Sequence, residues 1–418
     1  MSRWASFENE LRFLLRDRAF VIWIWVVLGF SSFAVWTGLA EVRQQRESIA
    51  FLLEADQKDR TSELSKQGDW GSAAYYAFHL TYDPPSDFAF AAMGQRDAAS
   101  WKHRLRMLAL EGQIYEHDPG NPELALIGRF DFAFVVAFVL PLVLAFLLHD
   151  LQASERSAGR FNLLIASTGR GRSLWRRRAV LRSGGVLIAT IVPLLIAGGV
   201  SGTRVATLAS ATALVVAYVV FWTFICLWFA RSKRSAPVIL ASLIGVWVLL
   251  STVLPAGGRA ITDRLVPIPT GAEILMTQRE AVNDAWDLPV EDTMAPFVQR
   301  HPEWTGYVYS GDGFDWGWYY AFQQVGDQTV EELSSAYTAG RTERDRLAGW
   351  ISIIAPPALL ERLLQQLAGT DMQSVLAYEA QVRAFHAELR TFHYPGLFGG
   401  EPFDPAMLSA LPQYLPTK

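Results

Sequence analysis

Long uncharged apolar runs alternate along this chain with charged polar stretches. A helix rises 1.5 Å per residue, so about 20 apolar residues cross the roughly 30 Å hydrocarbon layer of a bilayer. We therefore predict five membrane-spanning helices, at residues 19–40, 132–148, 183–203, 205–230 and 235–258. The first run exceeds the apolar part of a signal peptide and no clear A-x-A site follows it, which favours an uncleaved anchor.

Two prolines and the only cysteine fall inside these runs. Pro141 and Pro193 would break a soluble helix, but in a bundle the neighbouring helices can satisfy the backbone groups that a proline frees. Cys226 lies in the fourth run, where a free thiol behaves as a small hydrophobic side chain. A single cysteine excludes an internal disulfide and a cysteine-based metal site.

Positive charge gathers at residues 1–18, at residues 149–182 and in the short link after the fourth run, all on one side if the runs alternate. Residues 149–182 hold eight arginines against two acidic residues. On the other side, residues 41–128 hold nine basic and fourteen acidic residues, and residues 259–418 hold eleven and twenty-one. Lysine and arginine accumulate on the cytoplasmic side of membrane proteins. We therefore expect a cytoplasmic N-terminus and two extracytoplasmic segments, 41–131 and 259–418.

The arginine-rich stretch at residues 169–173 and the three arginines at 176–178 would also suit nucleic-acid binding. A topogenic role with contact to anionic headgroups accounts for the same residues without a further partner. We therefore expect membrane lipid, and no nucleic acid, as a partner of this segment.

The first acidic segment carries helical patterns of its own. Residues 41–67 are charged and rich in helix formers, which predicts that the first helix continues beyond the membrane. Residues 83–86 predict a turn, because a residue that precedes proline is disfavoured in the helical region. We expect a second helix at residues 97–117.

The C-terminal segment has helical spacing at residues 329–337, 357–367 and 371–392, with Thr370 or Asp371 suited to an N-cap. The apolar stretch at residues 350–355 is too short to span a membrane. Together these patterns predict an all-α polytopic membrane protein. Its five transmembrane helices carry a mostly α-helical extracytoplasmic module built from two insertions.

An aromatic-rich stretch occupies residues 304–322. One interpretation is a ligand cage of aromatic faces, with Asp312 and Asp315 as polar partners. The favoured alternative is an interfacial aromatic belt or a loop packed on the membrane surface. The aromatic residues concerned in either case are Trp304, Tyr307, Tyr309, Trp316 and Trp318.

The chain lacks the common motifs of catalysis and nucleotide binding: H-E-x-x-H, G-x-S-x-G and G-x-x-x-x-G-K-[ST] are all absent. His386 and His393 share a helical face, but no acidic or cysteine ligand has a matching spacing, so we interpret them as surface or packing residues rather than metal ligands. Ionisable residues are nearly absent from the five runs, whereas ion-coupled carriers usually keep them there. We expect no enzymatic activity and no metal or cofactor in this chain, and energy supplied by a partner.

The N-terminal stretch, residues 7–18, resembles the E-x-R-x-L-x-R-D-R interface helix of type 2 ABC exporter permeases. Its apolar residues Phe7, Leu11, Leu14 and Leu15 form one stripe opposite a charged face. In this family the helix lies along the cytoplasmic membrane surface before the first span.

Residues 150–164 resemble the coupling region of the same family, E-R-E-x-G-T-L-x-x-L-L. Ser157 and Arg160 depart from the family pattern, so the local charge differs. The positions that fit are Glu155, Arg156, Gly159, Leu163 and Leu164. Short motifs at 83–86, 94–97, 121–122, 128–132, 367–371 and 385–386 further resemble a bacterial subgroup that has a large extracytoplasmic insertion of uncharacterised role.

The resemblance implies the membrane subunit of an ATP-driven exporter in the bacterial inner membrane. A separate ABC ATPase dimer would bind ATP and magnesium and dock on the cytoplasmic face. Glu155 and Arg156 would make charged contacts, Gly159 would allow close helix approach, and Arg160 would touch lipid or the ATPase. The residues implied for the whole ATPase-coupling interface are Glu8, Arg12, Glu155, Arg156, Gly159 and Arg160.

Permeases of this class usually have six spans, whereas five are predicted here, so we expect a second permease subunit of similar build. The substrate is left open. One alternative is a membrane-anchored receptor or assembly scaffold whose exterior binds a partner. An intramembrane enzyme is disfavoured, because the predicted spans lack catalytic polar residues.

Overall fold

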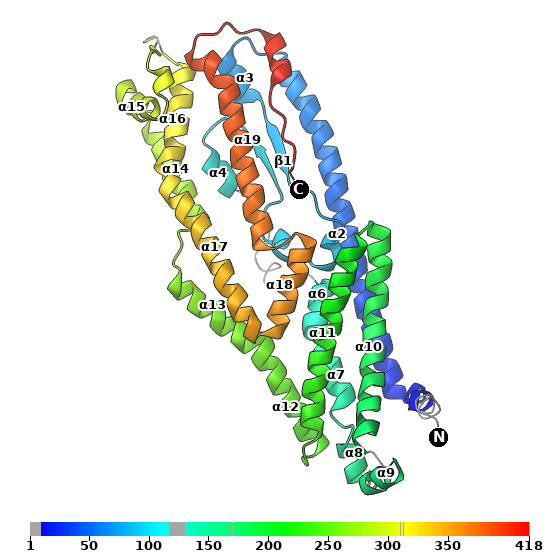
Figure 1. The fold of residues 1–418 in the computed structure, drawn as a ribbon. Coiled ribbons are helices and arrows are strands. Elements are labelled where there is room, and N and C mark those ends of the chain that lie inside the picture. The colour runs from blue at the N-terminus through cyan, green and yellow to red at the C-terminus, as the bar shows by residue number, and fades with distance from the viewer. Residues whose placement is uncertain (1–9, 117–129, 169–170, 310, 312, 418) are drawn as a thin grey trace.

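The computed structural model describes residues 10–116, 130–168, 171–309, 311 and 313–417, and these residues are almost entirely helical (Figure 1). Among these residues, five helices are long and apolar enough to cross a membrane, by length and composition. This confirms the mostly helical class and the predicted number of long apolar helices.

Each predicted span has its counterpart. The first and third helices extend beyond their predicted runs, and the fourth helix has the same ends as its predicted run. The first continues without a break for 47 residues, which confirms the predicted continuation beyond the apolar run. The elements are α2 (Arg18–Leu64); α6 (Phe132–Phe134), the π turn η3 (Val135–Val139) and α7 (Leu140–Leu148); α10 (Gly171–Ser201); α11 (Val205–Ala230); and α12 (Ala236–Val248), the π turn η4 (Leu249–Val253) and α13 (Leu254–Leu265).

The second span lies at the centre of the bundle. In its most apolar window 67% of the residues are buried, against 17% to 39% in the other four. Helix α7 contacts α2, α10, α11 and α12. The outer faces of the bundle are apolar. On α11, Val220, Phe224 and Trp228 form an exposed stripe at positions i, i+4 and i+8. Such a surface suits hydrocarbon rather than water.

Most of the remaining elements form what we call the distal module, which stands on the end of the bundle opposite the N-terminus (Figure 1). It also includes the part of α2 that follows Ala40. The elements are α3 (Trp70–Tyr76), β1 (His79–Tyr82), η1 (Ala89–Ala91), η2 (Gly94–Asp97), β2 (Lys102–Leu105), α4 (Leu110–Tyr115), α14 (Gly271–Asp284), α15 (Val290–Arg300), η5 (Pro302–Trp304), α16 (Trp316–Thr329), α17 (Glu331–Ile354), α18 (Pro356–Ala368), α19 (Met372–Phe398) and η6 (Pro405–Ala410).

The helix predicted at residues 97–117 is wrong. Within its described part, a 3-10 turn leads into strand β2, which pairs antiparallel with β1 so that His79 faces Leu105 and Tyr82 faces Lys102. Burial alternates along β2, with His103 and Leu105 inside and Arg104 outside, which is the period of a strand and not of a helix. Only Leu110–Tyr115 is helical there.

The C-terminal helices agree better with the sequence. Helix α18 contains the predicted segment 357–367, while α17 and α19 begin at Glu331 and Met372, one or two residues inside the predicted starts, and continue past the predicted ends. Asp371 is the N-cap of α19 and its carboxylate accepts the backbone N–H of Ser374 at 3.3 Å. The apolar residues 350–354 form the last turns of α17.

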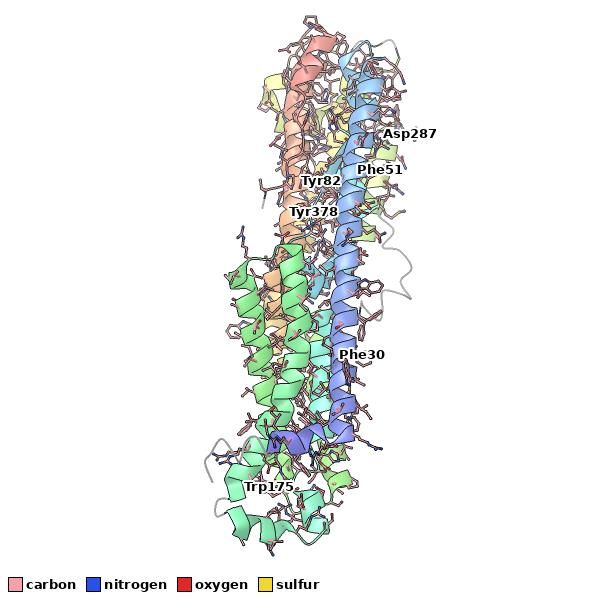
Figure 2. The ribbon with its side chains drawn as sticks, turned by 90° about the vertical axis from the view of Figure 1, so that its right-hand side faces the viewer. Phe30, Phe51, Tyr82, Trp175, Asp287 and Tyr378 are labelled. Atoms are coloured by element: carbon pink, nitrogen blue, oxygen red, sulfur yellow. The ribbon has the colours of Figure 1, made fainter. Side chains whose placement is uncertain are left out.

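The two inserted segments pack as one body. Tyr378 of α19 makes a hydrogen bond of 3.0 Å to Thr81 of β1, and Figure 2 shows Tyr82 and Tyr378 in the same region between α19 and α2. The Arg383 guanidinium of α19 contacts both carboxylate oxygens of Glu111 in α4, at 2.7 and 2.9 Å. Helix α18 is the joint to the bundle, because Leu360 and Leu364 share a core with the spans.

Candidate functional site

At the N-terminal end of the molecule, polar segments gather beyond the spans (Figures 1 and 2). Helix α8 (Ala153–Ser157) and helix α9 (Phe161–Thr168) connect α7 to α10. Residues 10–15 form a short helix, and Asp17 then caps α2 by accepting the N–H of Ala19 at 3.1 Å. We call the charged side chains that join these segments the basal cluster: Glu10, Glu155, Arg156, Arg160 and Arg178.

Arg178 of α10 is the centre of the basal cluster. Its Nε lies 3.1 Å from Glu10, and its Nη1 lies 3.3 Å from Glu155 on α8. Arg178 and Glu155 expose only 18% and 14% of their side chains, so solvent screens this pair less than an exposed one. Arg160 pairs with the other oxygen of Glu155 at 2.9 Å. One arginine therefore connects the N-terminal helix, the predicted coupling region and a span.

Arg156 faces the opposite way, towards the link between α11 and α12. Its guanidinium donates to the carbonyl oxygens of Ser232 and Arg231, the latter at 3.3 Å, and to the side chain of Gln152 at 2.8 Å. It also lies 4.8 Å from the ring centroid of Phe161. Arg156 thus connects the predicted coupling region to a second pair of spans.

Close helix approach at Gly159 is not seen within the described part of this chain, and the approach of a partner helix stays a prediction. A Cβ at this position would meet no atom within 4 Å, so no helix approaches it closely. Its φ angle is +72°, a left-handed conformation that favours glycine. Gly159 therefore makes the turn that ends α8 and brings Arg160 back beside Glu155.

The N-terminal helix is placed only in part. Arg12 is exposed, whereas Glu8 and Phe7 lie outside the described residues. Of the predicted apolar stripe, Leu14 is buried, while Leu11 and Leu15 expose 37% and 60% of their surface. These two are available to contact lipid if the helix lies on a membrane surface.

The sequence had identified the arginines of α10 only as topogenic. Besides Arg178, Arg182 lies 3.6 Å from both Asp17 and Asp150 and donates to the carbonyl of Leu147. Arg178 and Arg182 are four residues apart, about one helical turn, so the sequence already placed both on the same face of a helix. Within residues 149–182, Asp150 and Glu155 are the only acidic residues beside eight arginines, so the sequence also indicated them as ion-pair partners of these arginines.

The aromatic stretch lies at the other end, around α16, far from the span bundle (Figure 1). Trp318 is buried and its indole N–H donates to Thr293 at 2.7 Å. Tyr307 donates to Asp315, and its ring packs against Phe398, 5.3 Å away. These contacts hold the stretch against α15 and α19.

The other three aromatic rings pack in the same way. Trp316 lies so close to Gly71 that a Cβ there would be 1.9 Å from the indole. The ring of Trp304 lies tilted against Phe398, with the centroids 6.1 Å apart, and Tyr309 meets Trp318 edge-on at 6.0 Å. Trp318 is buried and the other four rings are partly buried, so all five pack within the distal module, and the ligand cage and the membrane-surface belt both stay predictions. Asp312 lies outside the described residues.

The two predicted packing histidines are buried on α19. His386 contacts the carbonyl of Arg106 at 3.1 Å, and burial lowers its pKa. Burial lowers the pKa of His393 to about 3, so its ring stays neutral at physiological pH. In the part of the chain that the structure describes, no group of three or more His, Cys, Asp or Glu residues is arranged to hold a metal ion.

Comparison with known proteins adds one match. Residues 272–417 match the model of a family described as a domain of unknown function, DUF3526. The matched region runs from α14 to beyond α19 and contains none of the five apolar helices. No curated protein and no solved structure matches the chain.

Proposed function

We propose that this chain is the membrane-spanning permease subunit of an ABC exporter in the bacterial inner membrane. A separate ATPase dimer would bind ATP and magnesium, and this chain would move an unidentified substrate across or out of the membrane. The observation that carries the proposal is the basal cluster, in which Arg178 joins Glu155 of the coupling region to Glu10 of the N-terminal helix.

The orientation follows from charge. The end that holds α8, α9 and the N-terminal helix is rich in arginine, which favours the cytoplasmic side. The acidic distal module would then lie outside the cytoplasm together with the C-terminus. The ATPase would meet the face formed by α8 and α9, where Leu163 exposes 70% of its surface.

Force would pass from the ATPase to the spans through these contacts. Movement of α8 displaces Glu155. Because Glu155 is paired with Arg178, which is part of α10, this movement is passed on to α10. Arg156 transmits the same movement to the link between α11 and α12. A nucleotide-dependent shift of α8 would therefore bias the bundle between two arrangements.

A second permease subunit would complete the transporter. The exposed stripe of Val220, Phe224 and Trp228 offers an apolar face to it or to lipid. The competing function, a membrane-anchored receptor or scaffold, needs no ATPase. Co-purification from native membranes therefore separates the two functions.

The proposal is tested by charge reversal. Glu155→Arg and Arg178→Glu each place like charges together, so each single variant should lower ATP hydrolysis by the co-purified complex. The double variant restores opposite charges between positions 155 and 178 but leaves like charges against Arg160 and Glu10, so it should recover only part of the lost activity. Glu332→Arg, at an exposed position of α17, is the matched control.

All variants should still insert into the membrane. If no ATPase co-purifies with the unchanged chain, the permease function is excluded and the receptor function is favoured. If an ATPase is present but both single variants keep full activity, the basal cluster does not couple the two subunits.

A further inference from the structure

A cavity of about 1080 Å³ lies where the distal module meets the bundle. Its walls come from α2, the segment around β2, α13, α17, α18 and the start of α19. This volume is at the upper end of the range found for pockets that bind small organic molecules. We call it the joint chamber.

The basic residues of the chamber walls are largely neutralised by acidic neighbours. Arg362 contacts both oxygens of Asp345, at 2.5 and 2.8 Å, Arg341 contacts Glu379 at 2.7 Å, and Arg344 contacts Asp263 at 3.0 Å. Arg96 pairs with Asp83 and also donates to Gln45. These pairs leave little free positive charge to attract an anion.

Glu361 of α18 is different. It lines the joint chamber and is partly buried, yet among the described residues the structure gives it no hydrogen bond and no ion pair. Burial and the nearby Asp131 carboxylate raise its pKa to about 7. Asp131 is itself occupied by the backbone N–H groups of Phe134 and Met93, at 2.8 and 3.0 Å. A partly buried carboxylate without a counter-ion is less stable in its charged form, so a cation at this point would be stabilised.

The chamber also borders the apolar surface of the bundle. The neighbours of Glu361 on α18, Leu360 and Leu364, pack in the core formed by the spans. The chamber lining itself includes apolar side chains, among them Pro255 of α13, Ile268 and Ile351 of α17. On α13, Ile261 exposes 58%, in continuity with the outer surface of the fifth apolar helix. Hydrocarbon is the medium that suits such walls.

We propose that the joint chamber binds an amphiphile with a cationic ammonium head, whose charge is balanced by Glu361. The ammonium group donates charge-assisted hydrogen bonds to the carboxylate. The alkyl tail lies against the apolar part of the lining, at Pro255, Ile268 and Ile351. Binding at this chamber is a property of the chain alone and does not require the ATPase partnership proposed above.

The test uses the purified full chain in an uncharged detergent. Dicyclohexylcarbodiimide, an apolar reagent that modifies protonated carboxyl groups, should label Glu361, and mass spectrometry of peptides locates the label. Dodecylammonium should protect Glu361 from labelling, whereas dodecanol, which has the same tail without the charge, should not. Glu111, which is paired with Arg383, is the internal control and should stay unlabelled.

Direct binding gives a second measurement. Calorimetric titration with dodecylammonium should show the affinity falling about tenfold or more in Glu361→Gln, the loss expected for one ion pair. Glu41→Gln changes another carboxylate of the chamber, one that already accepts the amide of Gln45 at 2.9 Å, and should keep the affinity. Equal protection by dodecanol, or unchanged affinity in Glu361→Gln, would overturn the proposal. Lyso-phosphatidylethanolamine as a third probe distinguishes a membrane lipid from other long-chain amines.

Discussion

The hydroxyl of Tyr218 on α11 donates a hydrogen bond of 2.6 Å to the carbonyl oxygen of Ala137 in the π turn η3. Ala137 lies four residues before Pro141, which has no N–H to give to that oxygen. The indole of Trp247 on α12 likewise donates to the next carbonyl, that of Phe138, at 3.1 Å. Side chains of two neighbouring helices thus donate the hydrogen bonds that these two carbonyl oxygens lack near the proline and the π turn. This is what the sequence predicted for prolines in a helix bundle.

Tyr218→Phe should therefore destabilise the protein by about 1 kcal/mol, because it leaves the Ala137 carbonyl without its donor in an apolar setting. Thermal unfolding in detergent should show a lower midpoint for this variant. Tyr76→Phe removes a hydroxyl from a side chain that is 47% exposed and should leave the midpoint unchanged. Equal midpoints for both variants would mean that the Ala137 carbonyl needs no partner.

The ion pair between Arg383 and Glu111 holds the two inserted segments together. Glu111→Gln leaves the Arg383 cation partly buried with a weaker partner, which should cost about 2 to 4 kcal/mol. The exposed pair of Arg346 and Glu343 is the control, since Glu343→Gln should not change stability measurably. Denaturant unfolding followed by tryptophan fluorescence measures both. A small effect at Glu111 would show that the apolar contacts alone join the segments.

The distal module should lose stability in mild acid. Burial lowers the pKa of His79 and of His393 to about 3, below the unfolded value of 6.5. The unfolded chain therefore binds protons more readily between these values, so stability is complete above pH 6.5 and falls as the pH drops towards 3. At pH 5 each histidine should cost about 2 kcal/mol.

This acid effect can be assigned to one side chain. His393 packs edge-on against Trp70 at 6.0 Å, and both of its ring nitrogens are buried without a hydrogen-bond partner among the described residues. His393→Phe should therefore unfold at a higher temperature than the unchanged protein at pH 5, with a smaller difference at pH 7.5. The same difference at both pH values would argue against titration of His393.

Labelling from either side of the membrane tests the orientation. In a Cys226→Ala background, Arg176→Cys places a thiol at an exposed position near the basal cluster, and Glu401→Cys places one in the distal module. A membrane-impermeant maleimide should label Glu401→Cys in intact spheroplasts and Arg176→Cys only after lysis. The opposite result would place the basal cluster outside the cell and exclude the proposed ATPase contact.

The apolar pattern was sufficient to locate the spans, because a bilayer imposes the same length and composition on every crossing helix. The fourth predicted span and α11 have the same ends, 205 and 230. The pattern also predicted the continuation of α2, and it predicted Thr370 or Asp371 as the N-cap, of which the structure shows Asp371. It failed at β2, where four residues in alternation are too few to compete with the helix-forming residues around them.

The sequence pattern could not predict contacts between residues that are far apart in the chain. Arg178 and Glu10 are 168 positions apart, and no spacing rule connects them. Gly159 matched a family position, but its role depends on a φ angle that the residue type alone does not reveal. Glu361 looked like any other polar residue of an amphipathic helix, because the absence of a partner is visible only when the surrounding walls are in place.

The unbroken run of α2 has a mechanical consequence. Its 47 residues make a rod about 70 Å long that begins at the basal cluster and passes the joint chamber at Gln45. If such a rod pivots by about 5° at Arg18, its distal tip swings by roughly 6 Å and Gln45 by about 3.5 Å. A small tilt at the base of α2 would therefore change the width of the chamber by about one methyl group, without any hydrogen bond within the helix being broken.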